Sequence, residues 1–182
     1  MLLSDRDIIH AHNTGMFELT PFNLELVQPA SVDVRLSNQF RLFDTPKTDC
    51  VDTANPEDST RLVTIPDTRP FVLHPGQFAL ACTYERIRLG TLLAARYEGK
   101  SSLGRLGLLT HITAGFIDPG FEGSITLELA NVSGIPVKLW PGMRIGQLCF
   151  FRMSSAPARA YGHESLGSHY QHQQGPTPSF QK

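Results

Sequence analysis

Cysteine is scarce in this sequence, and neither sign of charge predominates. The 182 residues include three cysteines, Cys50, Cys82 and Cys149, which are widely spaced. An odd number of distant cysteines argues against a disulfide framework and favours a reducing compartment, so we expect a cytoplasmic protein. The formal net charge is −1, and this excludes the strongly basic surface that is typical of proteins binding duplex nucleic acid.

Long apolar runs are also missing. No stretch of about 18 consecutive apolar residues occurs, so we expect no membrane-spanning helix. The first residues, MLLSDRDIIHAHN, become acidic within five positions and lack the apolar centre of a signal peptide. Because 41% of the residues are hydrophobic, the chain can form one domain with a substantial core.

The motifs of several hydrolase classes are absent as well. Zinc-dependent nucleobase deaminases carry H-x-E and P-C-x-x-C signatures, and neither occurs here. The seven histidines form no H-x-x-x-H pair, and there is no G-x-S-x-G nucleophile motif. We therefore expect a protein that uses no zinc.

Short segments of alternating polarity are what the chain does contain. Residues 4–15 predict a short helix. The segment SVDVRLSNQF alternates as a half-buried strand does, with Val32 and Val34 facing inward and Asp33 facing solvent. Further strands are expected at 71–89 (two strands around a Pro-Gly turn), 124–131 and 135–151 (again two). This pattern predicts a mainly β protein with a short N-terminal helix, folded as a barrel or a sandwich.

Two segments do not fit the strand pattern. Residues 44–69 are rich in Asp, Thr and Pro and predict a long excursion from the sheet, with a short edge hairpin at most. Residues 154–182 are rich in Ser, Pro, Gly, His and Gln, so we expect them to be disordered or to order only on a ligand or neighbour. The expected organisation is a β domain at 1–153 and a C-terminal tail at 154–182.

The stretch GKSSLGRLG resembles the end of a phosphate-binding P-loop. That motif needs a glycine five positions before the Gly-Lys pair, and Ala94 stands there instead. The residue types still suit a polyanion, because Lys100, Ser101, Ser102 and Arg105 offer charged and hydroxyl donors. An ordinary surface turn with a solvated Lys and Arg explains the same residues, so the segment alone does not decide.

Two carboxylates further along the chain each allow two interpretations, one structural and one functional. Asp118 lies in an Asp-Pro-Gly turn, where a capping role explains it. Glu128 lies between Leu127 and Leu129 on the opposite face of a predicted strand. If that face is solvent-exposed, Glu128 is an ordinary surface residue; if it lines a cleft, Glu128 is suited to moving protons. Periodicity cannot choose between the two.

Several long motifs in the same order resemble the dCTP deaminases of the dUTPase-like superfamily, over nearly the whole chain. The motifs are MLLSDRDI, LVQPASVDVRL, FVLHPGQFAL, EGKSSLGRLGLLTHITAGFIDPGFEGSITLELAN, LWPGMRIGQL and YGHESLGSHYQHQQGPTPS. The resemblance implies a distorted β-barrel and a homotrimer with active sites between subunits. It also implies zinc-free hydrolytic deamination of dCTP, with Mg²⁺ held mainly by the triphosphate. The tail would be a lid, and dTTP is a possible feedback inhibitor.

The resemblance further implies roles for individual residues. Glu128 would take a proton from the water that attacks C4 of cytosine, protonate N3 and assist loss of ammonia. Ser101, Arg105 and the backbone of Ala114 would hold that water and the developing charge. Asp118 would accept a hydrogen bond from the 3′-hydroxyl. The implied substrate-binding residues are Lys100, Ser101, Ser102, Leu103, Gly104, Arg105, Asp118, Thr126, Leu127, Glu128, Gln147, Tyr161 (stacked on the deoxyribose), His169 and Gln173.

The family contains enzymes that stop at dUTP and others that continue to dUMP. Ala114 and Gly115, in TAGFIDPGF, resemble the bifunctional type, because a His-Arg pair follows the alanine in enteric single-reaction members. We therefore expect the bifunctional reaction, with Asp118 orienting the second water. His169 departs from the family, which has a phosphate-binding lysine there. The alternatives are a deaminase that releases dUTP, a plain dUTPase, or a nucleotide-binding homologue with altered catalysis.

Overall fold

The computed structural model describes residues 1–46, 50–54 and 58–179. The elements are, in chain order, α1 (Asp5–Asn13), β1 (Phe17–Thr20), η1 (Leu24–Leu26), β2 (Val27–Gln28), β3 (Ser31–Phe43), β4 (Thr60–Thr64), β5 (Phe71–Leu73), β6 (Phe78–Leu89), β7 (Leu93–Gly99), α2 (Ser101–Gly104), β8 (Leu108–Leu109), β9 (Phe116–Ile117), β10 (Glu122–Asn131), β11 (Val137–Leu139), β12 (Arg144–Arg152) and η2 (Glu164–Leu166).

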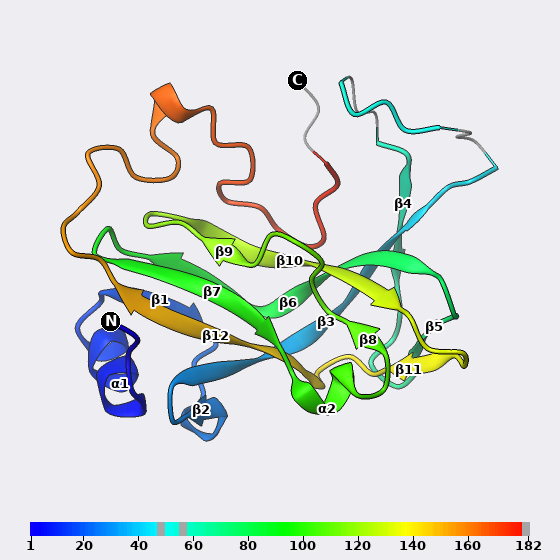
Figure 1. The fold of residues 1–182 in the computed structure, drawn as a ribbon, viewed down its shortest axis with the longest axis horizontal. Coiled ribbons are helices and arrows are strands. Elements are labelled where there is room, and N and C mark those ends of the chain that lie inside the picture. Colours follow the sequence, from blue (N-terminus) through cyan, green and yellow to red (C-terminus); the bar gives the residue numbers. More distant parts are fainter. Residues whose placement is uncertain (47–49, 55–57, 180–182) are drawn as a thin grey trace.

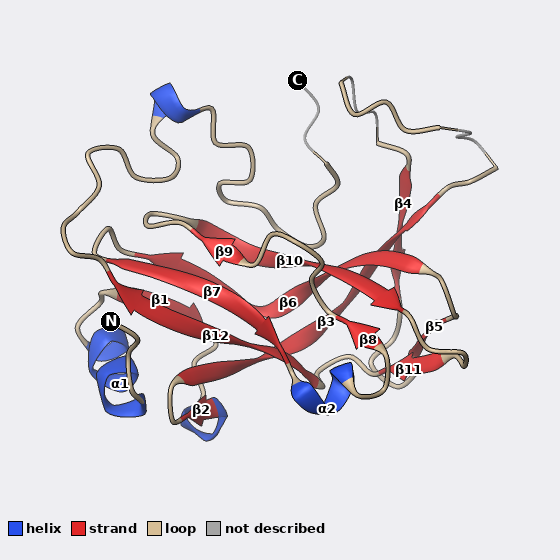
Figure 2. Cartoon of the chain, viewed as in Figure 1, coloured by secondary structure: helices blue, strands red, loops and turns tan. Residues whose placement is uncertain are grey.

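Most of the strands belong to one strongly curled sheet (Figures 1 and 2). Its strand order is β8-β10-β6-β3-β12-β7-β9, while β1 pairs with β6 and β2 and β4 pair with β3. A separate two-stranded sheet joins β5 to β11. The mainly β, barrel-like architecture that the sequence predicted is confirmed, because strands dominate the described chain and helices are few.

The predicted N-terminal helix is present as α1. The Ser4 side chain accepts a hydrogen bond from the backbone of Asp7, and the Asp7 carboxylate accepts one from Ser4 in return. This reciprocal capping satisfies backbone donors that the first turn leaves unpaired. Ile8 and Ala11 are the buried face, which attaches the helix to the core beside β1.

The alternation predicted for residues 31–40 is only partly correct. Val32, Val34 and Leu36 are fully buried, as expected. Asp33, which was expected to face solvent, is 1% exposed. The reason is that β3 lies between β6 and β12 in the sheet, and cationic side chains from other segments cover its second face at this point.

The two predicted strand pairs exist, but their members pair with other strands. β5 and β6 flank the turn at residues 74–76, yet β5 pairs with β11 and β6 with β10. Likewise β11 and β12 flank Pro141-Gly142, and β12 pairs with β3 and β7. A turn of this kind therefore marks strand boundaries here without forming a hairpin.

The tail runs back over the sheet above β9 and β10 (Figure 1, orange to red). Residues 154–179 pack on their own chain, although the composition predicted disorder or ordering only on a ligand or neighbour. Hydrogen bonds supply what apolar burial does not. Gln173 forms a parallel bridge with Gly123 of β10, and its backbone carbonyl accepts from the Ser124 N–H at 3.1 Å. The tail thereby covers the polar face of β10.

Candidate functional site

A cavity of about 1090 Å³ lies between β10 and the tail. Its floor is the face of β10 opposite the buried Leu127 and Leu129, together with the 111–121 segment around β9. The tail forms its roof, and the end of the loop between β3 and β4 (the 44–59 excursion) forms one side. Among the residues lining it are Phe43, Asp58, Thr60, His111, Ala114, Asp118, Thr126, Glu128, Tyr161, His169, Gln173 and Thr177.

Glu128 lines this cavity, so the choice left open by the strand periodicity is decided in favour of a cleft. Its Oε2 atom accepts hydrogen bonds from the backbone N–H groups of Ile112 at 2.8 Å and of Thr113 at 3.4 Å. Two backbone donors of this kind hold a carboxylate in one orientation. The side chain is half-buried, with the 111–114 loop beside it. The carboxylate is thus positioned to accept and return a proton.

Two tail residues are held over the same cavity by defined contacts. The Tyr161 ring packs edge-on against Phe121, with 5.6 Å between ring centroids, and its hydroxyl accepts a hydrogen bond from the Tyr170 N–H at 3.1 Å. The Gln173 amide donates to the Ser124 carbonyl at 2.6 Å, beside the Thr126 hydroxyl. These contacts give the roof a fixed arrangement of aromatic and amide groups.

Some of the predicted site residues lie together in this cavity. They are Ala114, Asp118, Thr126, Glu128, Tyr161, His169 and Gln173. Leu127 belongs to the same strand, but its side chain is fully buried in the core, so it can offer only its backbone to a ligand. Gly115 is buried directly behind Ala114.

The remaining predicted site residues lie elsewhere in the chain. The α2 segment, which begins directly after Lys100, lies at the bottom of Figure 1, while the tail is at the top. Neither residues 100–105 nor Gln147 are among the described residues that line the cavity. Ser101, Ser102 and Arg105 have exposed side chains. One chain by itself therefore does not assemble the complete predicted site.

An ion cluster around the buried Asp33 carboxylate organises this second group of residues. The Lys100 ammonium lies 2.6 Å from Oδ1 of Asp33, and an Arg144 guanidinium nitrogen lies 3.3 Å from Oδ2. Beside them, the Ser31 hydroxyl donates to Oε1 of Gln147 at 2.7 Å. The cluster fixes the base of α2 and carries one excess positive charge, which suits a neighbouring anion.

Sequence reasoning missed two members of this cluster, Asp33 and Arg144. The available signal was the position of Asp33 in ASVDVRL, directly between two buried valines. Alternation alone assigns such a residue to solvent, and nothing local shows that Lys100, 67 positions away, covers it.

Replacing Asp33 by Asn is expected to lower the free energy of unfolding by about 2 kcal/mol, because the amide cannot neutralise either cation. The loss stays moderate since the Lys100 and Arg144 side chains, 25% and 51% exposed, can turn to water. Urea unfolding at matched protein concentration measures it. The control is Glu18→Gln, which removes the exposed pair with Arg88 and should lower the free energy of unfolding far less than Asp33→Asn does. Equal losses in the two variants would contradict this account.

Gly115 occupies a position with no space for a side chain. A Cβ atom built there would lie 2.8 Å from the Tyr97 carbonyl oxygen and 3.0 Å from the His111 ring. The Gly115 carbonyl accepts a 2.7 Å hydrogen bond from the Tyr97 N–H, which keeps the two backbones close. Burial raises the pKa of the Tyr97 phenol, which stays protonated and donates to the Ile145 carbonyl at 3.2 Å. Gly115 thus sets the path of the loop that holds Glu128.

Within residues 1–46, 50–54 and 58–179, no three His, Cys, Asp or Glu side chains are grouped so that they could hold a metal ion. Over the same residues, no helix is both long and apolar enough to cross a membrane.

Comparisons with known proteins agree with the resemblance seen in the motifs. The family described as dCTP deaminase-like matches residues 2–153. The chain is 60% identical over 180 residues to a protein of Bifidobacterium animalis subsp. lactis (strain AD011), with 98% of this chain and 93% of that protein covered. It is 58% identical to a protein of Thermobifida fusca (strain YX), with 98% and 92% covered. Both relatives are named "dCTP deaminase, dUMP-forming".

Among solved structures, the fold is similar to that of 2'-deoxycytidine 5'-triphosphate deaminase from Agrobacterium tumefaciens, with a TM-score of 0.66 and 22% identity. The match covers 84% of this chain and 48% of that chain, so this chain spans about half of that longer protein. At this identity the likeness concerns the fold alone.

Proposed function

The chain belongs to the dCTP deaminase-like family, and from this premise we infer that it deaminates dCTP hydrolytically and carries the product on to dUMP. The relatives at 57–60% identity share the name "dCTP deaminase, dUMP-forming". The observation that carries the chemistry is Glu128, a carboxylate held by backbone donors at the floor of a covered cavity.

For the deamination we propose that Glu128 moves protons between water, cytosine and the leaving group. The carboxylate takes a proton from water as the water oxygen bonds to C4, and it gives this proton to N3. It then transfers the remaining hydroxyl proton to the exocyclic amine, so that the C4–N4 bond breaks and ammonia leaves. The uracil product keeps its proton on N3, and Glu128 is again a carboxylate. Ala114, which lines the cavity on the adjacent loop, would hold the water through its backbone.

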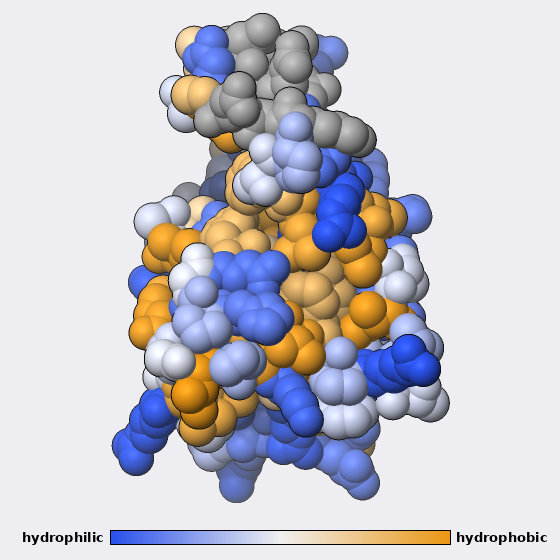
Figure 3. All heavy atoms as spheres, turned by 90° about the vertical axis from the view of Figure 1, so that its right-hand side faces the viewer, coloured by the Kyte–Doolittle hydropathy of each residue, from blue (hydrophilic) through white to orange (hydrophobic). Residues whose placement is uncertain are grey.

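We propose that Ser101 and Arg105 come to this site from a second copy of the chain. Lys100, Ser102 and Gln147 belong to the same distant group, and none of these residues lines the cavity of the single chain. Exposed apolar side chains support association, and Figure 3 shows hydrophobic patches, separated by hydrophilic residues, on the face that it presents. The exposed apolar side chains around the loops near α2 and β9 are Leu106, Leu109, Ile112, Phe116, Val132 and Ile135. A trimer would close a ring of three such sites.

For the second step we propose that water attacks the α-phosphorus of dUTP and releases pyrophosphate. Asp118, exposed at the edge of the cavity, would orient this water. Mg²⁺ would enter with the triphosphate as part of the substrate and neutralise its charge. His169 lies in the roof, where the family lysine would contact phosphate.

Gly115→Ala is expected to reduce dUMP formation more than deamination. The added methyl would press on the Tyr97 carbonyl, so the backbone at Gly115 must shift and the space beside Asp118 changes. We expect free dUTP to accumulate, with the ratio of dUTP to dUMP rising by about tenfold, a change of roughly 1.4 kcal/mol in the partition between steps. Chromatography of the products of dCTP measures this ratio. Gly134→Ala, a glycine with open space around it, is the control and should not change the ratio.

One product assay tests the whole proposal. The protein is incubated with dCTP and, separately, with dUTP, and ammonia, dUTP, dUMP and pyrophosphate are measured together. Ammonia and pyrophosphate in equal amounts with dUMP are expected from dCTP. Accumulated dUTP without pyrophosphate would identify a deaminase that stops after the first step. Pyrophosphate from dUTP without ammonia from dCTP would identify a plain dUTPase.

A further inference from the structure

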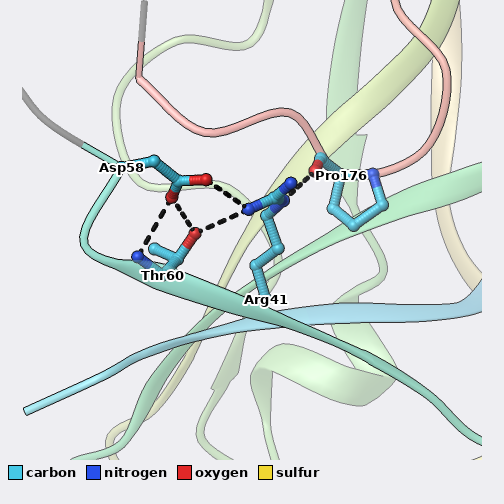
Figure 4. Close-up of polar contacts among 4 residues, drawn as sticks. All are labelled: Arg41, Asp58, Thr60 and Pro176. Carbon is cyan, nitrogen blue, oxygen red and sulfur yellow. Dashed lines mark hydrogen bonds and ion pairs between the residues drawn. The ribbon is translucent and has the colours of Figure 1, made fainter.

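Arg41, on β3, joins two segments that are far apart in the sequence (Figure 4). Its Nε atom donates to the Pro176 carbonyl of the tail at 2.8 Å. Its Nη1 atom donates to Oδ2 of Asp58 at 2.8 Å and to the Thr60 hydroxyl at 2.9 Å. The guanidinium therefore lies between the tail on one side and the end of the 44–59 excursion on the other.

The excursion side of this contact is itself held in place. The Asp58 carboxylate accepts hydrogen bonds from both the backbone N–H and the hydroxyl of Thr60. Partial burial would raise the pKa of Asp58, but the Thr60 hydrogen bonds and the Arg41 charge outweigh it and lower that pKa. Asp58 therefore stays ionised at neutral pH, and its carboxylate orients the Arg41 guanidinium.

The tail side reaches Arg41 through a tight turn at Gly175. This residue has φ +69°, a conformation that L side chains rarely adopt, and a Cβ there would lie 2.6 Å from Oε1 of Gln39 on β3. The turn directs the next carbonyl, that of Pro176, toward Arg41. One residue later, the Thr177 N–H donates to the Thr126 hydroxyl on β10 at 3.3 Å. The tail is thus attached to β3 and β10 at neighbouring positions.

The contacts of Arg41 lie beside the cavity, away from the proposed catalytic residue Glu128. Asp58 and Thr60 line one side of the cavity, and Gln173 and Thr177 line its roof. Arg41 is not among the described residues that line it. Any effect of Arg41 on the reaction must therefore act through the position of the roof relative to that side.

We propose that Arg41 is a positioning residue for nucleotide binding, which joins the tail at Pro176 to the end of the 44–59 excursion and so keeps Gln173 and Thr177 over the cavity. The proposal rests on the proposed function, in that the cavity is taken to hold the nucleotide. Arg41 suits the task because a planar guanidinium donates in two directions at once, which a lysine ammonium on a flexible stem does less well. Because the roof would cover a bound nucleotide, loss of Arg41 is expected to affect binding more than the proton transfers at Glu128.

The test compares Arg41→Gln with Arg61→Gln, which removes an exposed arginine from the adjacent strand β4. In Arg41→Gln, KM for dCTP is expected to rise about tenfold, as for loss of a charge-assisted hydrogen bond, while kcat changes less than about threefold. Arg41→Lys should give an intermediate KM. Arg61→Gln should match the unmodified chain.

Hydrogen exchange gives a readout that does not depend on catalysis. The amides of Gln173 and Thr177 are expected to exchange faster in Arg41→Gln than in Arg61→Gln, with no nucleotide present. Asp58→Asn should accelerate exchange of the same amides to a smaller degree. This second variant leaves the sequence of β3 unchanged, so it still tests the proposal if Arg41→Gln does not fold. Unchanged exchange at these amides, with KM within about twofold of the original, would overturn the proposal. Faster exchange in a chain that does not convert dCTP would support the anchoring by Arg41 and reject the proposed function.

Discussion

Glu128→Gln is expected to lower the rate of ammonia release from dCTP by about 10³-fold, the usual contribution of a positioned acid and base. Glutamine has nearly the same shape, and its carbonyl oxygen can still accept the hydrogen bond from the Ile112 N–H. It cannot take a proton from water or return one to N3, so only the positioning of the substrate remains. Single-turnover assays of ammonia measure the chemical step, and calorimetric titration with dCTP measures binding, which should change little.

Glu98→Gln is the matched control for this substitution. Glu98 lies on β7 and pairs with Arg96 at 2.6 Å, and it does not line the cavity. Its loss should leave ammonia release within about twofold of the original rate, because exposed ion pairs contribute little. Turnover by Glu128→Gln close to that of the control would remove Glu128 from the mechanism. If Glu128→Gln lost both dCTP binding and turnover, the result would instead indicate that Glu128 holds the cytosine base in the ground state.

Mixing Glu128→Gln chains with Arg105→Gln chains is expected to restore activity that neither variant has alone. Glu128 lines the cavity of its own chain, whereas Arg105 lies on the distant α2 segment with its side chain exposed. If each site takes Glu128 from one chain and Arg105 from its neighbour, equal mixing leaves about a quarter of the sites intact. The two variants are dissociated, mixed, reassembled and assayed for ammonia release. The mixture should reach about a quarter of the original rate.

The complementation has an internal control and a clear contrary result. Each variant carried alone through the same dissociation and reassembly should stay inactive. Native mass spectrometry of differently labelled chains establishes that mixed assemblies have formed. Mixed assemblies without recovered activity would mean that Glu128 and Arg105 act within one chain, or that Arg105 takes no part. A single-chain species with full activity would exclude the shared site altogether.

Local sequence patterns were sufficient for much of the fold. The helix at α1 follows from Ser4 and Asp7, which cap one another over three residues. The strands follow from an alternation of period two, and the burial of Leu127 and Leu129 placed Glu128 on the opposite face of β10. Each of these signals lies within a few residues, where backbone geometry alone relates one side chain to the next. The motif resemblance added the family and the identity of the candidate site residues.

Which segments meet was decided by the tertiary structure. β5 pairs with β11 instead of its neighbour β6, and Asp33 is buried because Lys100 and Arg144 reach it from other parts of the chain. Arg41 contacts Pro176 across 135 positions of sequence. Such partners depend on how a curled sheet brings its strands together, and side-chain periodicity along one strand carries no information about it.

For the candidate site, too, some features follow from the sequence and others only from the tertiary structure. The sequence by itself determined that GKSS, Asp118 and Glu128 belong to one family pattern and that the chain makes a β domain with a polar tail. The tertiary structure decided that Glu128 faces a covered cavity and that α2 lies away from it in the same chain. The physical reason is that a strand's alternation defines two faces, while only the packing of the tail and the other strands determines which face meets solvent, a cavity or a second chain.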